Sequence, residues 1–579
     1  MKSTIDKRIL FVALAALAVF AAGIAYRAIF YRDLAGTICY EMEAARRILQ
    51  GQVPFRDFYF DLPLTLVVFR MPAICLAQLA SAHTGGALLP ADLQTGLPLV
   101  FPFASLALGS FIEVSALALL SFALCIYIVS LTKLDQRCQL QLWFLLIGFG
   151  LANFAMGYSY GSAQHIFALL LSPYLFLRLT AWSSFSVNAA RPWLRFGCGL
   201  LAGFGASFDV WFILVPLAIE TVEFLSRRLG GKANRFAYEL LGLIISFCIS
   251  WSYLLRLDPA ALRELVDWII PLKITSYYLD QIAYFGLGST PDRRDVIYFC
   301  AAAAILSFGI VNRVALLRPI FTLMMAGFVL YQIGMSGLST DILLVVWASC
   351  MSFALQFCYL LESSFFSRIC RRYPRLSYRR LPKVQIFALV ALCSISLLSL
   401  ATAEILQRRE NVTVLTGPNA IDPTYLELTD AFAKFSQSGE SIMILNGRLL
   451  PGFPLYALVE RPIAGYFIST EAFSSLANIE SHDLKDDVLG KPFGWIAATK
   501  KKMFDRLRCD IAKSQPGVIV VEGGQTFDGL EKANVIAQIL ANYTSQGEAR
   551  YHSRCIGAKE FADWNYRYNV YERHGKGQN

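Results

Sequence analysis

Runs of about 20 apolar residues recur along this chain, and each is long enough to cross a bilayer as an α-helix. The first of them extends from about Ile9 to Ile29. Charged residues make up 16% of the 579 positions, compared with about 25% in a typical soluble protein, and are too few to cover a soluble surface. A soluble enzyme, a disordered protein and a secreted disulfide scaffold are therefore excluded. The sequence predicts a polytopic α-helical membrane protein.

The hydropathy pattern predicts about eleven membrane-spanning helices. The adjacent pair 196–207 and 209–225 is short, and basic residues flank both of its outer ends, so we expect two helices joined by a turn at 207–209. The apolar segment 63–82 contains an arginine and a proline, and we expect it to lie along the outer face or to dip into it. The spans after the first are expected near 103–131, 140–158, 163–181, 196–207, 209–225, 236–256, 296–312, 316–334, 340–361 and 384–403.

Basic residues in the short loops set the expected orientation. Much of the net charge of +10 lies between apolar segments, which indicates cytoplasmic loops and gives no reason to expect a nucleic-acid partner. Residues 368–383 hold seven basic side chains and no acidic one, and we expect this loop in the cytoplasm. A signal peptide is the competing interpretation of the first run, but the run is long and no clear small-residue cleavage site comes before Tyr26 and Arg27. We expect a multi-pass inner-membrane protein with a cytoplasmic N-terminus.

This orientation divides the chain into two predicted domains. Residues 1–404 form the transmembrane domain, which carries two large outer loops at 31–102 and 257–295. Residues 405–579 form a C-terminal extracytoplasmic, or periplasmic, α/β domain.

The C-terminal domain has alternating strand and helix signals. Its two cysteines, Cys509 and Cys555, are an even pair in an oxidising compartment, and we predict a disulfide between them. Strands are expected at 441–445 and 517–521, helices at 424–436 and 526–541, and a turn entering a strand at 452–456.

The first outer loop is the most informative stretch. A helix is predicted over 37–50, ending at Gly51, and Glu43 is spaced to pair with Arg46 and Arg47. A solvated amphipathic helix would explain these charges alone. It would not explain the dense aromatic residues of the segment 52–63 that follows. We interpret the loop as a site where arginines hold a phosphate and carboxylates act as a base.

The stretch Ala44–Phe58, AARRILQGQVPFRDF, resembles the first outer loop of polytopic glycosyltransferases of the GT-C superfamily, which includes protein mannosyltransferase-like and aminoarabinose transferase-like enzymes. Residues 158–165 with 171–174, and the glycine-rich segment 199–207, more weakly resemble bacterial members. The resemblance implies a sugar donor carried on a polyprenyl phosphate. It also implies transfer on the outer face to a lipid, glycan or protein acceptor.

The resemblance further implies a catalytic aspartate soon after the first helix, about fourteen residues before the glycine that matches Gly51. That position falls on residues 36–37, which carry no carboxylate. Asp33 lies about one helical turn earlier, and we expect it to deprotonate the acceptor hydroxyl. Asp57 and Glu41 are the other candidates, although Asp57 could equally cap a turn.

The remaining candidates would bind substrate. Arginine recognises phosphate oxygens through paired hydrogen bonds, although pairing with nearby carboxylates or lipid headgroups explains these arginines equally well. Asp209 lies at the expected turn between two membrane helices. A charge inside a membrane is energetically costly and often functional, but that cost disappears if the turn reaches the water outside. His165 is a candidate as well, although a lone histidine near the start of a helix more often has a structural role. The set is Arg46, Arg47, Arg56, Asp61, His165 and Asp209.

No cofactor is expected, because phosphate is the leaving group and a carboxylate supplies the base. No cluster of His, Cys and Asp has metal-ligand spacing, so any divalent cation would be held loosely by carboxylates. Membrane lipids are the remaining expected partners. The rival interpretation is a transporter or a non-catalytic assembly factor for a cell-envelope polysaccharide. A transporter would favour internal repeats, which the sequence does not show, but the displaced aspartate supports this rival.

Overall fold

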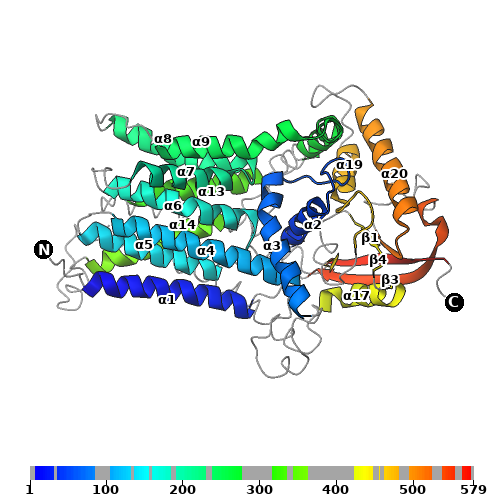
Figure 1. The fold of residues 1–579 in the computed structure, drawn as a ribbon, viewed down its shortest axis with the longest axis horizontal. Coiled ribbons are helices and arrows are strands. Elements are labelled where there is room, and N and C mark those ends of the chain that lie inside the picture. Colours follow the sequence, from blue (N-terminus) through cyan, green and yellow to red (C-terminus); the bar gives the residue numbers. More distant parts are fainter. Residues whose placement is uncertain are drawn as a thin grey trace, which may run out of the picture. The chain divides into compact units, whose positions relative to one another are not determined.

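The computed structural model groups the chain into two compact units (Figure 1). Unit 1 comprises Met1–Tyr31, Phe111–Ser252 and Ser289–Arg408, and unit 2 comprises Arg32–Ser110, Tyr253–Gly288 and Arg409–Asn579. The structure describes residues 7–30, 36–84, 105–131, 136–155, 160–183, 191–229, 238–276, 316–334, 343–362, 423–437, 439–446, 455–456, 462–481, 494–523, 538–553 and 564–574.

The described secondary structure of unit 1 is helical, with short turns between the helices. Each predicted span that falls among them coincides with a helix, whereas the predicted spans 296–312 and 384–403 lie outside them. The helices are α1 (Lys7–Phe30), most of α4 (Ser105–Leu131), α5 (Gln136–Ala155), α6 (Ala163–Ser183), α7 (Pro192–Ala206), η4 (Val210–Ile213), α8 (Leu214–Leu229), α9 (Tyr238–Trp251) with most of η5 (Ser252–Arg256) passing into unit 2, α13 (Leu317–Gly334) and α14 (Leu343–Glu362).

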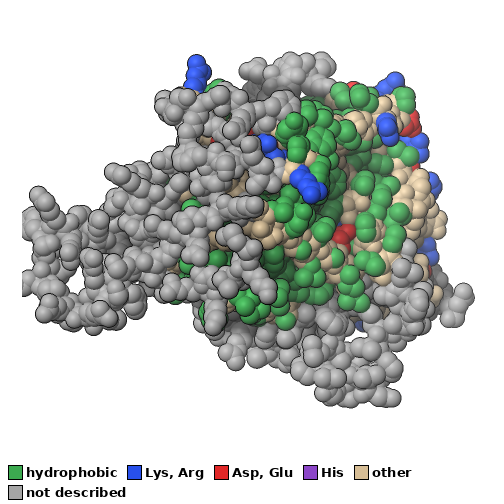
Figure 2. Space-filling view, turned by 60° about the vertical axis from the view of Figure 1, so that its left-hand side comes forward, with side chains coloured by type: hydrophobic (Ala, Val, Ile, Leu, Met, Phe, Trp, Pro, Cys, Tyr) green, Lys and Arg blue, Asp and Glu red, His purple; other side chains and the backbone are tan. Residues whose placement is uncertain are grey.

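Three segments of the described chain are long and apolar enough to cross a membrane: Ile9–Tyr26, Leu108–Leu131 and Tyr238–Arg256. Figure 2 shows one face of the molecule on which apolar side chains form a broad exposed surface with few charged ones. A surface of this kind is unfavourable in water and suits a bilayer. The expected total of about eleven spans stays a prediction.

Helices α7 and α9 pack closely because three glycines lie at their contact (Figure 1). A methyl group on Gly199 would lie 2.1 Å from the carbonyl oxygen of Glu239, and one on Gly203 would lie 2.2 Å from that of Leu243. On α9, a methyl group on Gly242 would lie 2.3 Å from the carbonyl oxygen of Phe196. Small residues at such spacing let helix backbones approach each other in membranes.

The predicted break between the two short helices is confirmed. Helix α7 ends at Ala206, and the 3₁₀ helix η4 begins at Val210 before α8 continues. The glycine-rich segment that resembles bacterial glycosyltransferases therefore lies mostly within α7, where Gly199 and Gly203 make the close contacts with α9.

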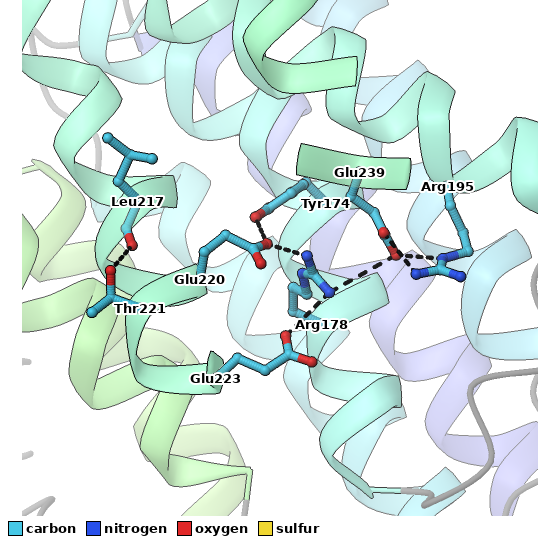
Figure 3. A network of polar contacts seen from close by, with 8 residues as sticks. All are labelled: Tyr174, Arg178, Arg195, Leu217, Glu220, Thr221, Glu223 and Glu239. Carbon is cyan, nitrogen blue, oxygen red and sulfur yellow. Dashed lines mark hydrogen bonds and ion pairs between the residues drawn. The ribbon is translucent and has the colours of Figure 1, made fainter. Parts of the chain in front are cut away.

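A buried ionic network joins α6, α7, α8 and α9 (Figure 3). The Arg178 guanidinium contacts Glu220, and it lies 3.1 Å from Glu223 and 4.0 Å from Glu239. Arg195 donates to both oxygens of Glu239 at 2.6 and 2.8 Å. Three carboxylates against two guanidinium groups leave one excess negative charge. These contacts connect the C-terminal part of α6 and the middle of α8 with the N-terminal parts of α7 and α9.

Unit 2 combines helices with a four-stranded sheet of order β1-β2-β4-β3. β1 and β2 are parallel, with Met443 opposite Ile519, whereas β2 pairs antiparallel with β4 and β4 with β3. Its elements are α2 (Gly36–Leu49), α3 (Leu64–Thr84), α10 (Pro259–Glu264), the π-helical turn η6 (Leu265–Ile269), α17 (Pro423–Phe435), β1 (Ile442–Leu445), α19 (Glu471–Ser481), α20 (Trp495–Ser514), β2 (Val518–Glu522), η8 (Leu540–Asn542), β3 (Tyr543–Ser553) and β4 (Trp564–Arg573).

Several C-terminal elements coincide with the predicted ones. β1 and β2 lie at 441–445 and 517–521 within one residue, and α17 lies at 424–436. Most of the predicted helix 526–541 lies outside the described residues. Leu455 and Tyr456 lie in a helical turn, and not in the strand expected there.

A single hydrophobic core runs through all three segments of unit 2. It contains Phe58 from the first segment, Trp268 from the second, and Ile444 with Val520 from the C-terminal segment. This grouping differs from a division of the chain at residue 404. The two predicted outer loops pack with the C-terminal residues through their described parts, because their apolar side chains share one core.

Candidate functional site

Helix α2 ends just before Gly51, where the sequence predicts its end. Gly51 has a φ of 84°, a left-handed conformation that residues with a Cβ rarely adopt. Its N–H donates to the Ile48 carbonyl at 2.9 Å, and the N–H of Gln52 donates to the Arg47 carbonyl at 3.0 Å. These bonds satisfy the last carbonyls of the helix. The predicted stop at Gly51 is confirmed.

The residues after Gln52 form a tight, strained turn. Phe55 has a φ of 68°, which is unusual for a bulky residue, and its side chain is buried in the core of unit 2. Its N–H donates to the Phe58 carbonyl at 2.9 Å, and its own carbonyl accepts from the Tyr466 hydroxyl at 2.7 Å. The Asp57 carboxylate accepts from the Val53 N–H at 2.7 Å. Asp57 therefore caps a turn, which is the alternative to its role as a catalytic base.

Arg56 joins two carboxylates at the surface of unit 2. Its guanidinium donates to Asp57 at 3.0 and 2.9 Å and to Asp258 at 2.7 Å. The three side chains are 42%, 33% and 36% exposed, so a ligand can reach them. The hydrogen bonds from Arg56 lower the pKa of Asp57. The Ala260 N–H, followed by Arg56, lowers the pKa of Asp258.

We call Arg56, Asp57 and Asp258 the surface triad. It pairs a cation that can contact phosphate oxygens with two carboxylates that are ionised at neutral pH. Arg506 supports the triad from α20 by donating to the Arg56 carbonyl at 2.6 Å, and its guanidinium stacks 4.0 Å from the Tyr466 ring centre.

Asp61 belongs to a second polar group. Its carboxylate accepts from the Tyr40 hydroxyl at 3.1 Å and lies 3.3 Å from the Lys273 ammonium, which also donates to the Asp61 carbonyl. The Lys273 side chain is exposed. This group joins the first segment of unit 2 to the second, and it leaves a cation at the surface.

Arg46 and Arg47 have different surroundings. Arg46 pairs with Glu43 at 2.7 Å and is partly exposed, so it can still meet a ligand. Arg47 also bonds Glu43, but its remaining donors point at the carbonyls of Gly465 at 2.8 Å and Ile463 at 3.0 Å. Both predicted pairings of Glu43 are confirmed. The contacts of Arg47 favour a structural role, and its binding of phosphate stays a prediction.

Glu41 is fully buried within unit 2. Its carboxylate bonds the equally buried Arg70 at 2.8 Å, which joins α2 to α3. Burial raises the pKa of Glu41, and the Arg70 charge offsets part of that rise. A carboxylate enclosed in this way has no access to an acceptor hydroxyl in this structure, and its contacts favour a structural role.

His165 and Asp209 belong to unit 1. The Nδ1 atom of buried His165 accepts from the Gly161 N–H at 2.9 Å, and the Asp209 carboxylate caps η4 by accepting from the Trp211 N–H at 3.0 Å. Asp33 lies outside the described residues. Cys509 is exposed on α20, and its predicted partner Cys555 is not among the described residues, so the disulfide stays a prediction.

Three residues of these groups are not among the candidate site residues that the sequence offers. Asp258 stands directly before Pro259, and this pair predicts the start of a helix. Its pairing with Arg56 could not be predicted, because the two residues are 202 positions apart in the sequence. Arg506 is one of several basic residues on α20, and nothing in the sequence distinguishes it. Lys273 stands beside a proline-containing apolar run without any local signal. Among the described residues, no group of three or more His, Cys, Asp and Glu side chains is arranged to hold a metal ion.

No protein-family model matches the chain, and no curated protein sequence matches it. Three solved structures are similar at 12–13% identity. The oligosaccharyltransferase of Archaeoglobus fulgidus in its apo form has a TM-score of 0.41 at 13% identity and covers 94% of this chain and 73% of its own. The A. fulgidus oligosaccharyltransferase AglB, in complex with an inhibitory peptide and a dolichol-phosphate, has a TM-score of 0.40 at 13% identity, covering 93% and 73%.

The third is ArnT from Cupriavidus metallidurans bound to undecaprenyl phosphate, with a TM-score of 0.42 at 12% identity, covering 97% of each chain. At TM-scores this low, we base no functional conclusion on these likenesses. The case for function comes from the residues of the chain itself.

Proposed function

We propose that this chain is an integral membrane glycosyltransferase of the GT-C type. It would move a sugar from a polyprenyl-phosphate donor to a lipid, glycan or protein acceptor of the cell envelope. The observation that carries the proposal is the surface triad. The stretch that resembles a glycosyltransferase outer loop ends in a half-exposed Arg56 and Asp57, and a second predicted outer segment adds Asp258 to them.

The proposed reaction is a single inverting displacement. The acceptor hydroxyl oxygen attacks the anomeric carbon, the bond from that carbon to the phosphate oxygen breaks, and the lipid phosphate leaves with the electron pair. A carboxylate takes the hydroxyl proton, and a positioned base contributes about 10²–10⁴-fold to such a step. Asp33 is the first candidate for the base and Asp57 the second. Arg46 and Arg56 are exposed enough to contact the phosphate.

The proposed orientation places unit 2 outside the cytoplasm of the inner membrane. Its three segments, 32–110, 253–288 and 409–579, correspond closely to the stretches that the positive-inside pattern predicts on the outer face. A shared core requires all three to lie on the same side of the membrane, which supports this assignment. The C-terminal α/β part would recognise the acceptor or close over the site.

Two observations favour a second candidate, a non-catalytic transporter or assembly factor for a cell-envelope polysaccharide. Glu41 and Arg47, two of the candidates for chemistry, bond to neighbouring residues of unit 2. Residues 36–37, where the resemblance implies the catalytic aspartate, carry no carboxylate.

Sugar transfer by the full-length protein tests the proposal. The protein in proteoliposomes receives a panel of polyprenyl-phosphate sugars, with membrane extract as acceptor. We expect transfer from one donor, and a loss of about 10²-fold or more when the base is changed in Asp33→Asn or Asp57→Asn. Asp505→Asn is the matched control, because Asp505 is an exposed carboxylate of α20. Absence of binding to every donor would overturn the proposal and favour the assembly factor.

A further inference from the structure

The helical segment 259–276 of unit 2 presents three different sides. It consists of α10, the π-helical turn η6 and a helical continuation through residue 276. One side packs into the core of unit 2 through apolar side chains that are at most 7% exposed. These are Ala261, Leu265, Trp268, Ile269 and Leu272.

The polar side of the segment is fixed to other parts of unit 2. Glu264 lies 2.8 Å from Lys502, and the Asp267 carbonyl accepts from the Trp495 indole N–H at 3.1 Å. That carbonyl is available because Pro271, four residues later, has no N–H to donate to it. The same proline accounts for the widened π-helical turn before it. These contacts hold the segment in one rotational position about its axis.

The third side is an exposed apolar stripe. Its side chains follow one another at four-residue intervals, and they are exposed by 39%, 48%, 41% and 46%. They are Leu262, Val266, Ile270 and Ile274. The outward residues of the candidate span in α9 are similarly exposed, with Leu241 at 39% and Ile244 at 47%. In water, this stripe would be an unfavourable surface on a helix whose opposite side is already buried.

Chain connectivity identifies what covers the stripe. The candidate membrane span Tyr238–Arg256 ends only six residues before Leu262, and six residues reach at most about 20 Å. Leu255, at the end of that span, is 89% exposed. The segment therefore begins within about 20 Å of the end of the candidate span, close enough for its stripe to reach lipid. Arg256 and Arg263 are exposed beside it, where they suit lipid headgroups.

We infer that the segment 259–276 is an interfacial helix that lies in the membrane surface with its stripe among the lipid acyl chains. Helices with an apolar face and a charged face bind in the plane of the interface in this way. The contact would hold Asp258, which caps the same helix, and its partner Arg56 at the level of the lipid headgroups. The inference does not depend on catalysis, since it stands for an enzyme and for an assembly factor alike.

Photocrosslinking of the unmodified full-length protein tests the inference. The protein is reconstituted in phosphatidylcholine–phosphatidylglycerol vesicles that contain a phospholipid with a diazirine in its acyl chain, and it is digested with trypsin after illumination. Cleavage after Arg263 and Lys273 releases the peptide 264–273, which carries Val266 and Ile270. The peptide 509–513 of α20, in which Cys509, Ala512 and Lys513 are exposed, is the control, and the digest is reduced so that the predicted disulfide to Cys555 does not retain it. We expect at least threefold more lipid adduct on 264–273, and equal labelling would overturn the inference.

A second measurement separates lipid from protein as the covering partner. A fluorescent amino acid is placed at Val266 or Ile270 of the stripe, and at Asp267 on the exposed polar side. We expect nitroxide groups on the acyl chains to quench the two stripe positions at least threefold more than position 267, and aqueous iodide to show the reverse order. Stronger iodide quenching at the stripe would overturn the inference. Protection of the stripe from both quenchers would also overturn it, because protein, such as a second copy of the chain, would then cover the stripe.

Discussion

Gly203→Ala is the sharpest test of the helix packing in unit 1, because the change adds one methyl group at a defined contact. Its Cβ would lie 2.2 Å from the Leu243 carbonyl oxygen and 2.9 Å from the Leu243 carbonyl carbon. Ordinary contact begins at 3.4 Å, so α7 and α9 would have to separate by about 1.2 Å (3.4 − 2.2) at this point. The obstacle is backbone, which cannot rotate away as a side chain can.

Gly197→Ala is the matched control on the same helix. A Cβ at Gly197 would meet no atom within 4 Å. Both positions lie inside α7, so the gain in helix propensity from glycine to alanine, about 1 kcal/mol, is common to the two variants and cancels in their difference. What remains is the cost of overpacking. We therefore expect the free energy of unfolding of Gly203→Ala to be about 1–3 kcal/mol below that of Gly197→Ala.

Reversible unfolding by sodium dodecyl sulfate in mixed micelles, followed by circular dichroism, measures this difference. Gly199→Ala and Gly242→Ala should behave like Gly203→Ala, because their methyl groups would also meet backbone oxygens. Equal stability of the Gly203 and Gly197 variants would refute the close approach of α7 and α9.

Three further predictions concern charged groups. Arg178→Met removes the guanidinium that contacts Glu220, Glu223 and Glu239, and we expect unfolding in mixed micelles to show a loss of about 3–5 kcal/mol, partly recovered when Glu220→Gln is added. Arg47→Met should cost about 2–4 kcal/mol, because it leaves the buried carbonyl of Ile463 and the half-buried carbonyl of Gly465 without their donor. Arg46→Met should cost less than about 1 kcal/mol, and equal losses would contradict the assigned contacts. The lowered pKa of Asp57 means that its stabilising contribution is present above the unfolded pKa of about 3.9 and is lost as the pH falls through the folded value. The melting temperature of Asp57→Asn should therefore lie below that of the wild type by a constant amount from pH 7 to 5, and the difference should shrink as the pH falls below about 3.9. A difference that grows as the pH falls would refute the sign.

Local features of this fold could be predicted from sequence because local chemistry determines them. The end of α2 follows from a glycine that accepts a left-handed conformation, and the pairing of Glu43 with Arg46 follows from helical spacing. The strands β1 and β2 follow from short apolar runs rich in β-branched residues.

Pairings between distant segments could not be predicted in the same way. The bonds from Arg47 reach carbonyls 416 and 418 positions away, and Arg56 meets Asp258 across 202 positions. Backbone carbonyls carry no sequence signal at all, and any acidic residue of the outer loops could have matched Arg56. The shared core of unit 2 selects these partners, because it sets which segments approach one another.

The charged residues of the first outer loop can be sorted by what their removal would change. Glu41→Gln keeps the shape of the side chain but leaves the Arg70 guanidinium buried without the carboxylate that neutralises it, at a cost of about 3–5 kcal/mol in folding. It should not change the turnover of the protein that remains folded. Asp57→Asn disturbs a partly exposed pair and should cost less than about 1 kcal/mol.

These two variants therefore separate structure from chemistry in one experiment. The stability of each purified variant is compared with its transfer rate per folded molecule, with Asp505→Asn as the control for surface charge. If Asp57 is the base, its variant loses turnover with little loss of stability, and the Glu41 variant shows the opposite pattern. A stable Glu41→Gln protein without transfer would contradict the structural role, because the carboxylate would then be needed for transfer and not for folding.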